Sequence, residues 1–142
     1  MQITSFFKYI MKKTKSYFTL LFVLITDQLT KHIAVQSMNW KANTGISFGI
    51  FPEFPLWAFF VLVSLVFLVM IIYKIKLNFA WSLFIAGMSG NLIDRIRFGY
   101  VVDWIPFPFP FIDRLYMNIA DMALILGFLC LILYSLKKTS HE

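Results

Sequence analysis

The chain has 142 residues, of which 60% are hydrophobic and only 14% are charged. A soluble domain is usually about a quarter charged, so this composition excludes an ordinary water-soluble protein and indicates a membrane protein with one compact domain. The formal net charge of +6 would also suit a nucleic-acid-binding protein. The basic residues, however, lie at the ends of apolar runs, as orientation signals do, and form no basic patch with interleaved aromatic residues.

Four segments are apolar enough to cross a bilayer as helices, which takes about 20 residues each. We predict spans at about 17–35, 55–73, 78–93 and 118–136. The third is short and holds small residues that permit close helix packing. No A-x-A-like cleavage site follows the first, so we expect it to be retained and not cleaved as a signal peptide. The four spans predict a single integral-membrane domain over residues 1–142.

The basic residues predict how these spans are oriented. Four spans put both termini on one side of the membrane, and cytoplasmic segments are enriched in Lys and Arg. Eight cations would lie on the side of the termini, against four in the two remaining loops, 36–54 and 94–117. We therefore expect cytoplasmic termini and outward-facing loops. The eight are Lys8, Lys12, Lys13, Lys15, Lys74, Lys76, Lys137 and Lys138; the four are Lys41, Arg95, Arg97 and Arg114.

Three acidic residues have a cation close by, which predicts charges neutralised for structural reasons. Asp27 and Lys31 are four residues apart, so they share a helix face and can pair. Asn91, Asp94 and Arg95 form one polar stripe, and Asp113 adjoins Arg114 in a loop. Glu53 and Glu142 are expected to be solvated. The single cysteine, Cys130, is expected to be a packing residue, and with two histidines in the chain no metal cluster is indicated.

Asp103 and Asp121 differ, because each lies among apolar residues with no cation within five positions. Desolvation raises the pKa of such a carboxyl group, and two of them side by side share one proton, which gives an acid and a base near neutral pH. Asp103 lies ten residues past the outer end of the third predicted span, and Asp121 lies in the outer first turn of the fourth. Both therefore belong to the same side of the membrane and could meet near its outer surface, where water is available. The alternative is that each carboxylate is merely hydrogen-bonded inside the helix bundle.

Four motifs in order resemble those of the bacterial lipoprotein signal peptidases, also called signal peptidase II. They are DQLTK at 27–31, NTGISFG at 43–49, GNLIDRIRFGYVVDWI at 90–105 and NIAD at 118–121. Each motif alone is weak, but the four together cover nearly the whole chain and are specific. The sequence departs from the family pattern at Ser47, usually Ala, and at Met117, usually Phe. These departures leave substrate preference open.

The resemblance implies an intramembrane aspartyl endopeptidase of the bacterial cytoplasmic membrane, with its site on the outer side. It would remove the signal peptide of prolipoproteins next to a diacylglyceryl-modified cysteine. The family's catalytic pair corresponds to Asp103 and Asp121. The family also has a small extracytoplasmic β-structured cradle between its first two spans. Supporting positions carried over are Asp27, Lys31, Asn43, Gly45, Asn91, Asp94, Arg95 and Asn118.

The mechanism implied is hydrolysis by an activated water. One aspartate, ionised, takes a proton from the water, and the other, protonated, binds the scissile carbonyl oxygen. Which aspartate starts protonated stays open at this point. Arg95 is expected to hold Asp94 or a substrate carbonyl. We expect no metal or other cofactor, no nucleic-acid partner, contacts with membrane lipids and prolipoprotein substrates, and a monomer.

Two other functions compete with this interpretation. A proton-coupled transporter or channel subunit would spread its acids across the membrane depth, whereas the acids at 94, 103, 113 and 121 all fall on the outer side. A non-catalytic membrane scaffold predicts that Asp103→Asn would have no effect. The Pro- and Phe-rich segment PFPFPFIDRLY, residues 106–116, is expected to be an apolar flap or surface strip and not a catalytic element.

Overall fold

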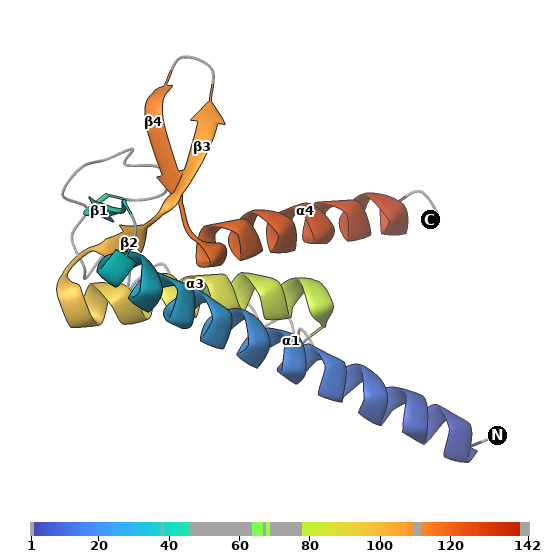
Figure 1. The fold of residues 1–142 in the computed structure, drawn as a ribbon. Coiled ribbons are helices and arrows are strands. Elements are labelled where there is room, and N and C mark those ends of the chain that lie inside the picture. The colour runs from blue at the N-terminus through green and yellow to red at the C-terminus, as the bar shows by residue number, and fades with distance from the viewer. Residues whose placement is uncertain are drawn as a thin grey trace.

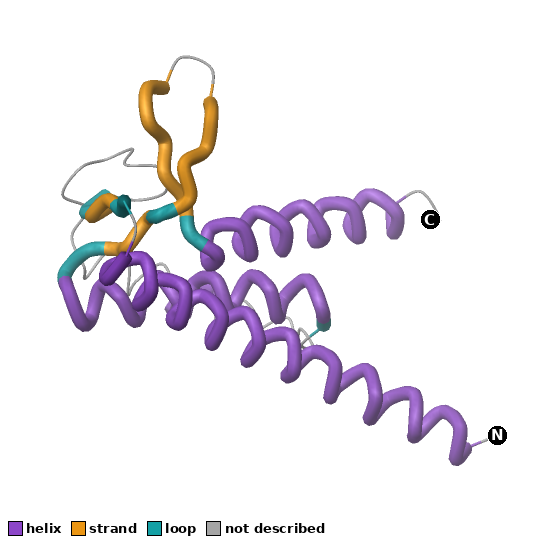
Figure 2. Tube along the Cα trace, viewed as in Figure 1, coloured by secondary structure: helices purple, strands orange, loops and turns teal. Residues whose placement is uncertain are grey.

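The computed structural model describes residues 2–37, 39–45, 64–66, 68, 78–109 and 112–139. Within these residues it is mostly helical, with two small two-stranded sheets (Figures 1 and 2). Most of the predicted second span, 55–73, lies outside the described residues, although 64–66 and 68 are helical. The elements are α1 (Gln2–Ser37), β1 (Lys41–Asn43), α3 (Phe79–Phe98), β2 (Val101–Asp103), β3 (Ile105–Phe109), β4 (Ile112–Met117) and α4 (Ile119–Thr139).

Helix α1 is considerably longer than the span predicted for it. Its 36 residues correspond to a length of about 54 Å, against a hydrocarbon core of about 30 Å. Among the described helices, the stretch Ile10–Ser37 is the one long and apolar enough to cross a membrane, and the apolar part of α4, Ile119–Tyr134, is shorter. Large apolar side chains on both helices are exposed, for example Phe22 and Leu133. This pattern suits helices that face lipid.

Helix α3 packs against both α1 and α4, and glycines bring the helix axes close (Figure 1). A Cβ atom on Gly90 would come within 2.6 Å of Asp27 Oδ2 and 3.1 Å of Ala120 Cβ. A Cβ atom on Gly87 would collide with the carbonyl oxygen of Ala120 and with Leu124. The close packing predicted for the small residues of this segment is confirmed. It places the polar residues of α3 directly against both neighbouring helices.

A glycine turn at the end of α3 leads the chain into β2. Gly99 has φ 79°, in the left-handed region, and its N–H donates to the carbonyl of Arg95 at 3.0 Å. Such a C-cap favours glycine because a Cβ atom would be strained there. The turn therefore sets the direction in which β2 presents Asp103.

Strand β2 pairs with β1, which follows the first helix. The pair is antiparallel, with Lys41 opposite Asp103 and Asn43 opposite Val101. The β-structure expected between the first two spans therefore has its partner strand in the segment after α3. Because the residues between 46 and 63 are outside the described part of the chain, the extent of the expected cradle stays a prediction.

The Pro- and Phe-rich segment forms the hairpin β3–β4, which projects sideways from the end of the helices (Figure 2). Pro106, Phe107 and Pro108 are exposed, in agreement with a surface strip. The prediction that residues 113 and 114 lie in a loop was wrong, since they fall within β4. Proline is compatible with a strand when the strand is at an edge, as β3 is in this two-stranded sheet.

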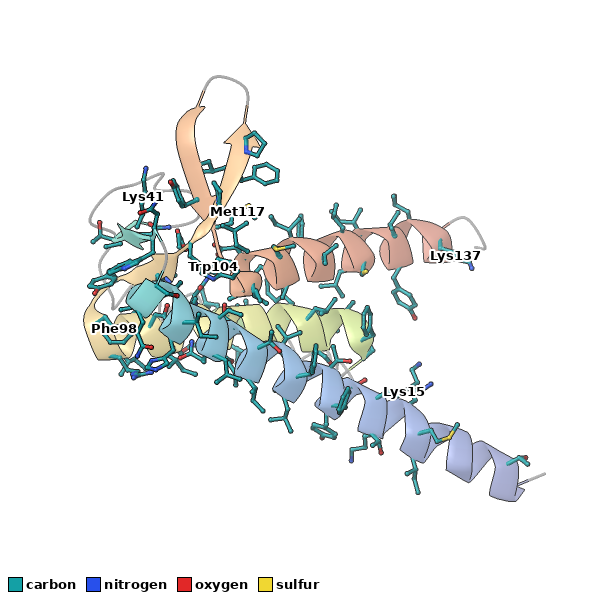
Figure 3. All side chains as sticks on the ribbon, in the orientation of Figure 1. Lys15, Lys41, Phe98, Trp104, Met117 and Lys137 are labelled. Carbon is teal, nitrogen blue, oxygen red and sulfur yellow. The ribbon has the colours of Figure 1, made fainter. Side chains whose placement is uncertain are left out.

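The N-terminal end of α1 and the C-terminal end of α4 both lie opposite to the sheets (Figure 1). Lys15 and Lys137 lie toward the terminal end, whereas Lys41, Trp104 and Met117 lie at the sheet end (Figure 3). The sheet end also contains the buried polar residues of β2 and the residue before α4. Buried Asp103 and Asn118 therefore lie at the sheet end of an apolar helix assembly, whereas the buried hydroxyl groups of Ser16 and Ser82 lie elsewhere along the helices.

Candidate active site

Asn118, the residue before α4, joins the two aspartates singled out in the sequence. Its side-chain Nδ2 donates to Oδ1 of Asp103 at 2.6 Å, and its backbone N–H donates to Oδ2 of Asp121 at 3.2 Å. Its Oδ1 accepts from the backbone N–H of Asp121 at 2.8 Å. This reciprocal pattern is the capping box expected at a helix N-terminus. Asn118 is fully buried, so the geometry of both carboxylates is fixed by one rigid residue.

Each carboxylate also accepts a hydrogen bond from a second amide. Nδ2 of Asn43, on β1, donates to Oδ2 of Asp103 at 2.9 Å. Nδ2 of Asn91, on α3, donates to Oδ1 of Asp121 at 2.8 Å. Both oxygens of both carboxylates are thus held by donors that come from several different elements. Asparagine amides orient a carboxylate without neutralising it, which preserves its capacity for acid–base chemistry.

Burial and, to a smaller extent, the nearby carboxylate of Asp121 together raise the pKa of Asp103 to about 7. The hydrogen bonds from Asn43 and Asn118 act in the opposite direction but are weaker. Asp103 is only 3% exposed, while Asp121 is partly exposed. A carboxyl group with a pKa near neutrality is suited to proton transfer at physiological pH.

A buried ion-pair cluster lies beside the two aspartates, centred on Lys31. Nζ of Lys31 lies 2.9 Å from Asp27 Oδ2 and 3.0 Å from Asp94 Oδ2. The predicted pairing of Asp27 with Lys31 is confirmed. For Asp94, the predicted neighbouring cation was Arg95, but the ion pair that the structure shows is with Lys31, which comes from a different helix. All three members of the cluster are buried.

The two acids of this cluster also bind backbone N–H groups of the segments that carry the aspartates. Oδ1 of Asp27 accepts from Ala120 N at 2.8 Å, and Oδ2 of Asp94 accepts from Val102 N at 3.1 Å. Ala120 and Val102 immediately precede Asp121 and Asp103 in the chain. The cluster therefore fixes the position of the two aspartates from the side of α1 and α3.

Arg95 contacts the backbone of two segments that lie near Asp103, while its expected hold on Asp94 or a substrate carbonyl stays a prediction. Its guanidinium donates to the carbonyl oxygens of Gly45 at 2.8 Å and Asn91 at 3.3 Å. The N–H of Gly45 in turn donates to Oδ1 of Asn43 at 3.0 Å. Arg95 thus ties the segment after β1 to α3, and this orients Asn43 toward Asp103. The remainder of the NTGISFG motif, from residue 46, lies outside the described residues.

Comparisons with known proteins agree with this arrangement. The sequence profile of a family described as signal peptidase (SPase) II matches residues 19–137. A lipoprotein signal peptidase of Thermodesulfovibrio yellowstonii is 33% identical, over 90% of this chain and 99% of the relative. One from Staphylococcus aureus is 32% identical, over 85% of this chain and 87% of the relative.

The chain belongs to the signal peptidase II family.

Solved structures agree with this assignment. A bacterial membrane enzyme with 30% sequence identity superposes with a TM-score of 0.79 and covers 91% of this chain and 92% of its own. A second, also 30% identical, gives a TM-score of 0.71 over 87% of this chain and 94% of its own. The protein is therefore a bacterial membrane enzyme, and as a signal peptidase II it is an aspartic peptidase.

Two residues of this signal peptidase II site were missed by sequence reasoning. Nε2 of Gln28 donates to Asp94 Oδ1 at 3.0 Å and to the carbonyl of Gly90 at 3.2 Å. Its position next to Asp27 in DQLTK was the available signal. The indole N–H of Trp104 is, among the buried side-chain polar atoms of the described residues, the one that lacks a hydrogen-bond partner. No sequence pattern distinguishes such a group.

Proposed function

We propose that Asp103 and Asp121 are the catalytic pair with which this lipoprotein signal peptidase removes signal peptides from diacylglyceryl-modified prolipoproteins. The observation that carries the proposal is that both carboxylates are hydrogen-bonded to the same residue, Asn118. Two carboxyl groups held together, one of them with a pKa near 7, form an acid and a base at neutral pH.

The reaction needs one proton on the pair. The ionised carboxylate takes a proton from a water molecule, whose oxygen then bonds to the scissile carbonyl carbon. The protonated carboxyl group donates a hydrogen bond to the carbonyl oxygen as negative charge develops there. The C–N bond then breaks, and a proton from the pair passes to the leaving amine. The amides of Asn43, Asn91 and Asn118 keep both carboxylates in place throughout.

We also propose four membrane spans, with both termini cytoplasmic and the site at the outer face. Lys15 and Lys137 lie toward the end of the helices that is opposite to the sheets (Figure 3). Cations at that end agree with the positive-inside rule. With this topology the acyl chains of a substrate stay in the outer leaflet while its peptide bond reaches the catalytic pair. In this proposal the protein contacts prolipoprotein substrates and membrane lipids, and it acts as a monomer.

The activity is tested with the purified protein and a diacylglyceryl-modified prolipoprotein, by following the released signal peptide on a gel. We expect cleavage of the modified precursor, and at least about 100-fold slower cleavage of the same precursor without the lipid, because the acyl chains place the peptide at membrane depth. Equal rates for the two precursors would contradict the proposed lipid-dependent positioning.

The pH dependence of cleavage follows from the carboxyl group of Asp103. Because its pKa is raised to about 7, the pair loses its last proton as the pH rises through that value. We expect kcat/KM to fall on the alkaline side, approaching about tenfold per pH unit. The apparent pKa belongs to the coupled pair and not to one residue. A rate that stays constant from pH 6 to pH 9, measured with a substrate free of titrating groups, would rule out this role for Asp103.

A further inference from the structure

The surroundings of the two aspartates are not symmetric, and the asymmetry bears on which of them holds the proton. We propose that Lys31 is a positioning residue that acts through Asn91 to keep Asp121 ionised, so that the proton of the pair rests on Asp103. Asp121 is then the base that activates water, and Asp103 is the acid. This inference rests on the proposed function and adds a division of roles to it.

A continuous chain of hydrogen bonds runs from Lys31 to Asp121. Nζ of Lys31 donates to Oδ1 of Asn91 at 3.0 Å, and Nδ2 of Asn91 donates to Oδ1 of Asp121 at 2.8 Å. An ammonium group bound to the amide oxygen polarises the amide and makes its N–H a stronger donor. A stronger donor favours the charged form of the carboxylate that accepts from it.

The corresponding amide of Asp103 has no comparable support. Oδ1 of Asn43 accepts from a neutral group, the backbone N–H of Gly45, at 3.0 Å. The second amide that donates to Asp103, that of Asn118, likewise has its Oδ1 bound to a neutral group, the backbone N–H of Asp121. Both amides that donate to Asp103 are therefore polarised less strongly than the amide of Asn91. Both carboxylates accept hydrogen bonds from asparagine side chains. They differ in the group bound to the asparagine Oδ1, which is the ammonium of Lys31 for Asn91 and a backbone N–H for Asn43.

The helix α4 adds a second asymmetry. Asp121 lies in its first turn, where it accepts a backbone N–H from Asn118, and the positive end of a helix dipole favours a negative charge. Asp103 ends the strand β2 and has no helix terminus of its own. Asp121 is also the more exposed of the two, so a water molecule to be activated can reach it.

The acids of the neighbouring cluster oppose a charge on Asp121, but each is already compensated. Asp27 and Asp94 both lie within 3.0 Å of Lys31. Each also accepts a backbone N–H, at 2.8 Å for Asp27 and 3.1 Å for Asp94. These contacts partly offset the negative charge of Asp27 and Asp94, while Lys31 reaches the pair through Asn91.

The remaining cations near the pair are Arg95 and Lys41. Arg95, from α3, interacts electrostatically with both Asp121 and Asp103 and donates to the carbonyl oxygens of Gly45 and Asn91. Lys41, from β1, extends over the ring of Tyr116, with its Nζ 4.7 Å from the ring centroid. Among the charged groups that face the pair from α1, α3 and β1, Lys31 is the one whose hydrogen-bond chain ends on Asp121.

The first test uses two variants with opposite changes in charge. Lys31→Gln removes a positive charge, so the acidic limb of the kcat/KM profile is expected to move up by about one pH unit. Asp94→Asn removes a negative charge from the same cluster, and the limb is expected to move down. Lys13→Gln, at an exposed lysine of the same helix, is the matched control and leaves the limb in place. Shifts in the same direction, or lower rates with no shift, would overturn the proposal.

The second test does not depend on cleavage or on the folding of the Lys31 variant. The aspartate carboxyl carbons are labelled with ¹³C and titrated by NMR, with assignments from Asp103→Asn and Asp121→Asn. At pH 6 we expect a protonated Asp103 and an ionised Asp121. In Asp121→Asn the pKa of Asp103 is expected to fall, because a neighbouring charge is gone. A protonated Asp121 with an ionised Asp103 would contradict this division of roles but not the catalytic pair. Cleavage by Asp103→Asn would contradict the catalytic pair itself.

Discussion

Asp103→Asn and Asp121→Asn are each expected to abolish cleavage of a diacylglyceryl-modified prolipoprotein, with a loss of about 1,000-fold or more in kcat. An asparagine can neither take a proton from water nor give one to the leaving amine. Since the two carboxyl groups act as a unit, the double variant is expected to lose little more than either single one. The measurement is a time course of signal-peptide release by purified protein in detergent or lipid vesicles.

The control for this prediction is Asp113→Asn, which makes the same chemical change in β4. It is expected to cleave at the rate of the unaltered protein. All variants are first compared by yield from membranes and by gel filtration, so that a loss of folding is recognised. Turnover by Asp103→Asn or Asp121→Asn at a tenth of the normal rate or more would exclude the two-carboxylate mechanism.

Gly87→Val is expected to cause the largest loss of stability among the helix-packing substitutions. A Cβ atom at this position meets the carbonyl oxygen of Ala120, which belongs to the backbone of α4 and cannot turn aside as a side chain can. We expect a destabilisation of about 3 kcal/mol, seen as a lower midpoint of thermal unfolding in detergent. Separation of α3 from α4 would also draw Asn91 away from Asp121, and a displacement of about 1 Å costs on the order of 100-fold in rate.

Gly99→Ala is the matched control, because it also adds a side chain to a glycine near α3. Nothing lies within 4 Å of a Cβ atom there, so its cost is the left-handed backbone alone, about 1 kcal/mol. A smaller drop in the unfolding midpoint for Gly87→Val than for Gly99→Ala would show that the α3–α4 contact tolerates expansion, contrary to this account.

The contacts that could be predicted from the sequence were the local ones. Asp27 and Lys31 pair because four residues bring two side chains to the same helix face. The ion-pair partner of Asp94 could not be predicted from spacing. The adjacent cation in the sequence is Arg95, whereas the ion pair forms with Lys31, which lies on another helix. The contact of Asn43 with Asp103 joins residues 60 positions apart through the β1–β2 pair. Such contacts depend on tertiary structure, about which spacing gives no information.

The boundaries of the first helix show another limit of sequence reasoning. The apolar run predicted a membrane-spanning helix at about 17–35, but the helix in the structure extends over Gln2–Ser37. Hydropathy detects the part of a helix that suits lipid, whereas the backbone hydrogen bonds of a helix continue into water wherever the residues permit it. The segment at 106–116 was likewise understood by its composition, as a surface strip, and its β-hairpin pairing became visible only in the structure.

The hydrogen bond between the carboxylate of Asp27 and the amide of Ala120 connects the first helix of the chain with the last. A ribosome makes α1 first, and its acid and ammonium groups neutralise each other locally, so this helix can enter the bilayer before its neighbours exist. Asp121 and the amide of Ala120 follow Asp27 by more than 90 residues, so they are translated only after α1, α3 and β2. With Asp103 and Asp121 as the proposed catalytic pair, a nascent chain is expected to stay inactive until residue 121 has been made and α4 has packed against α1.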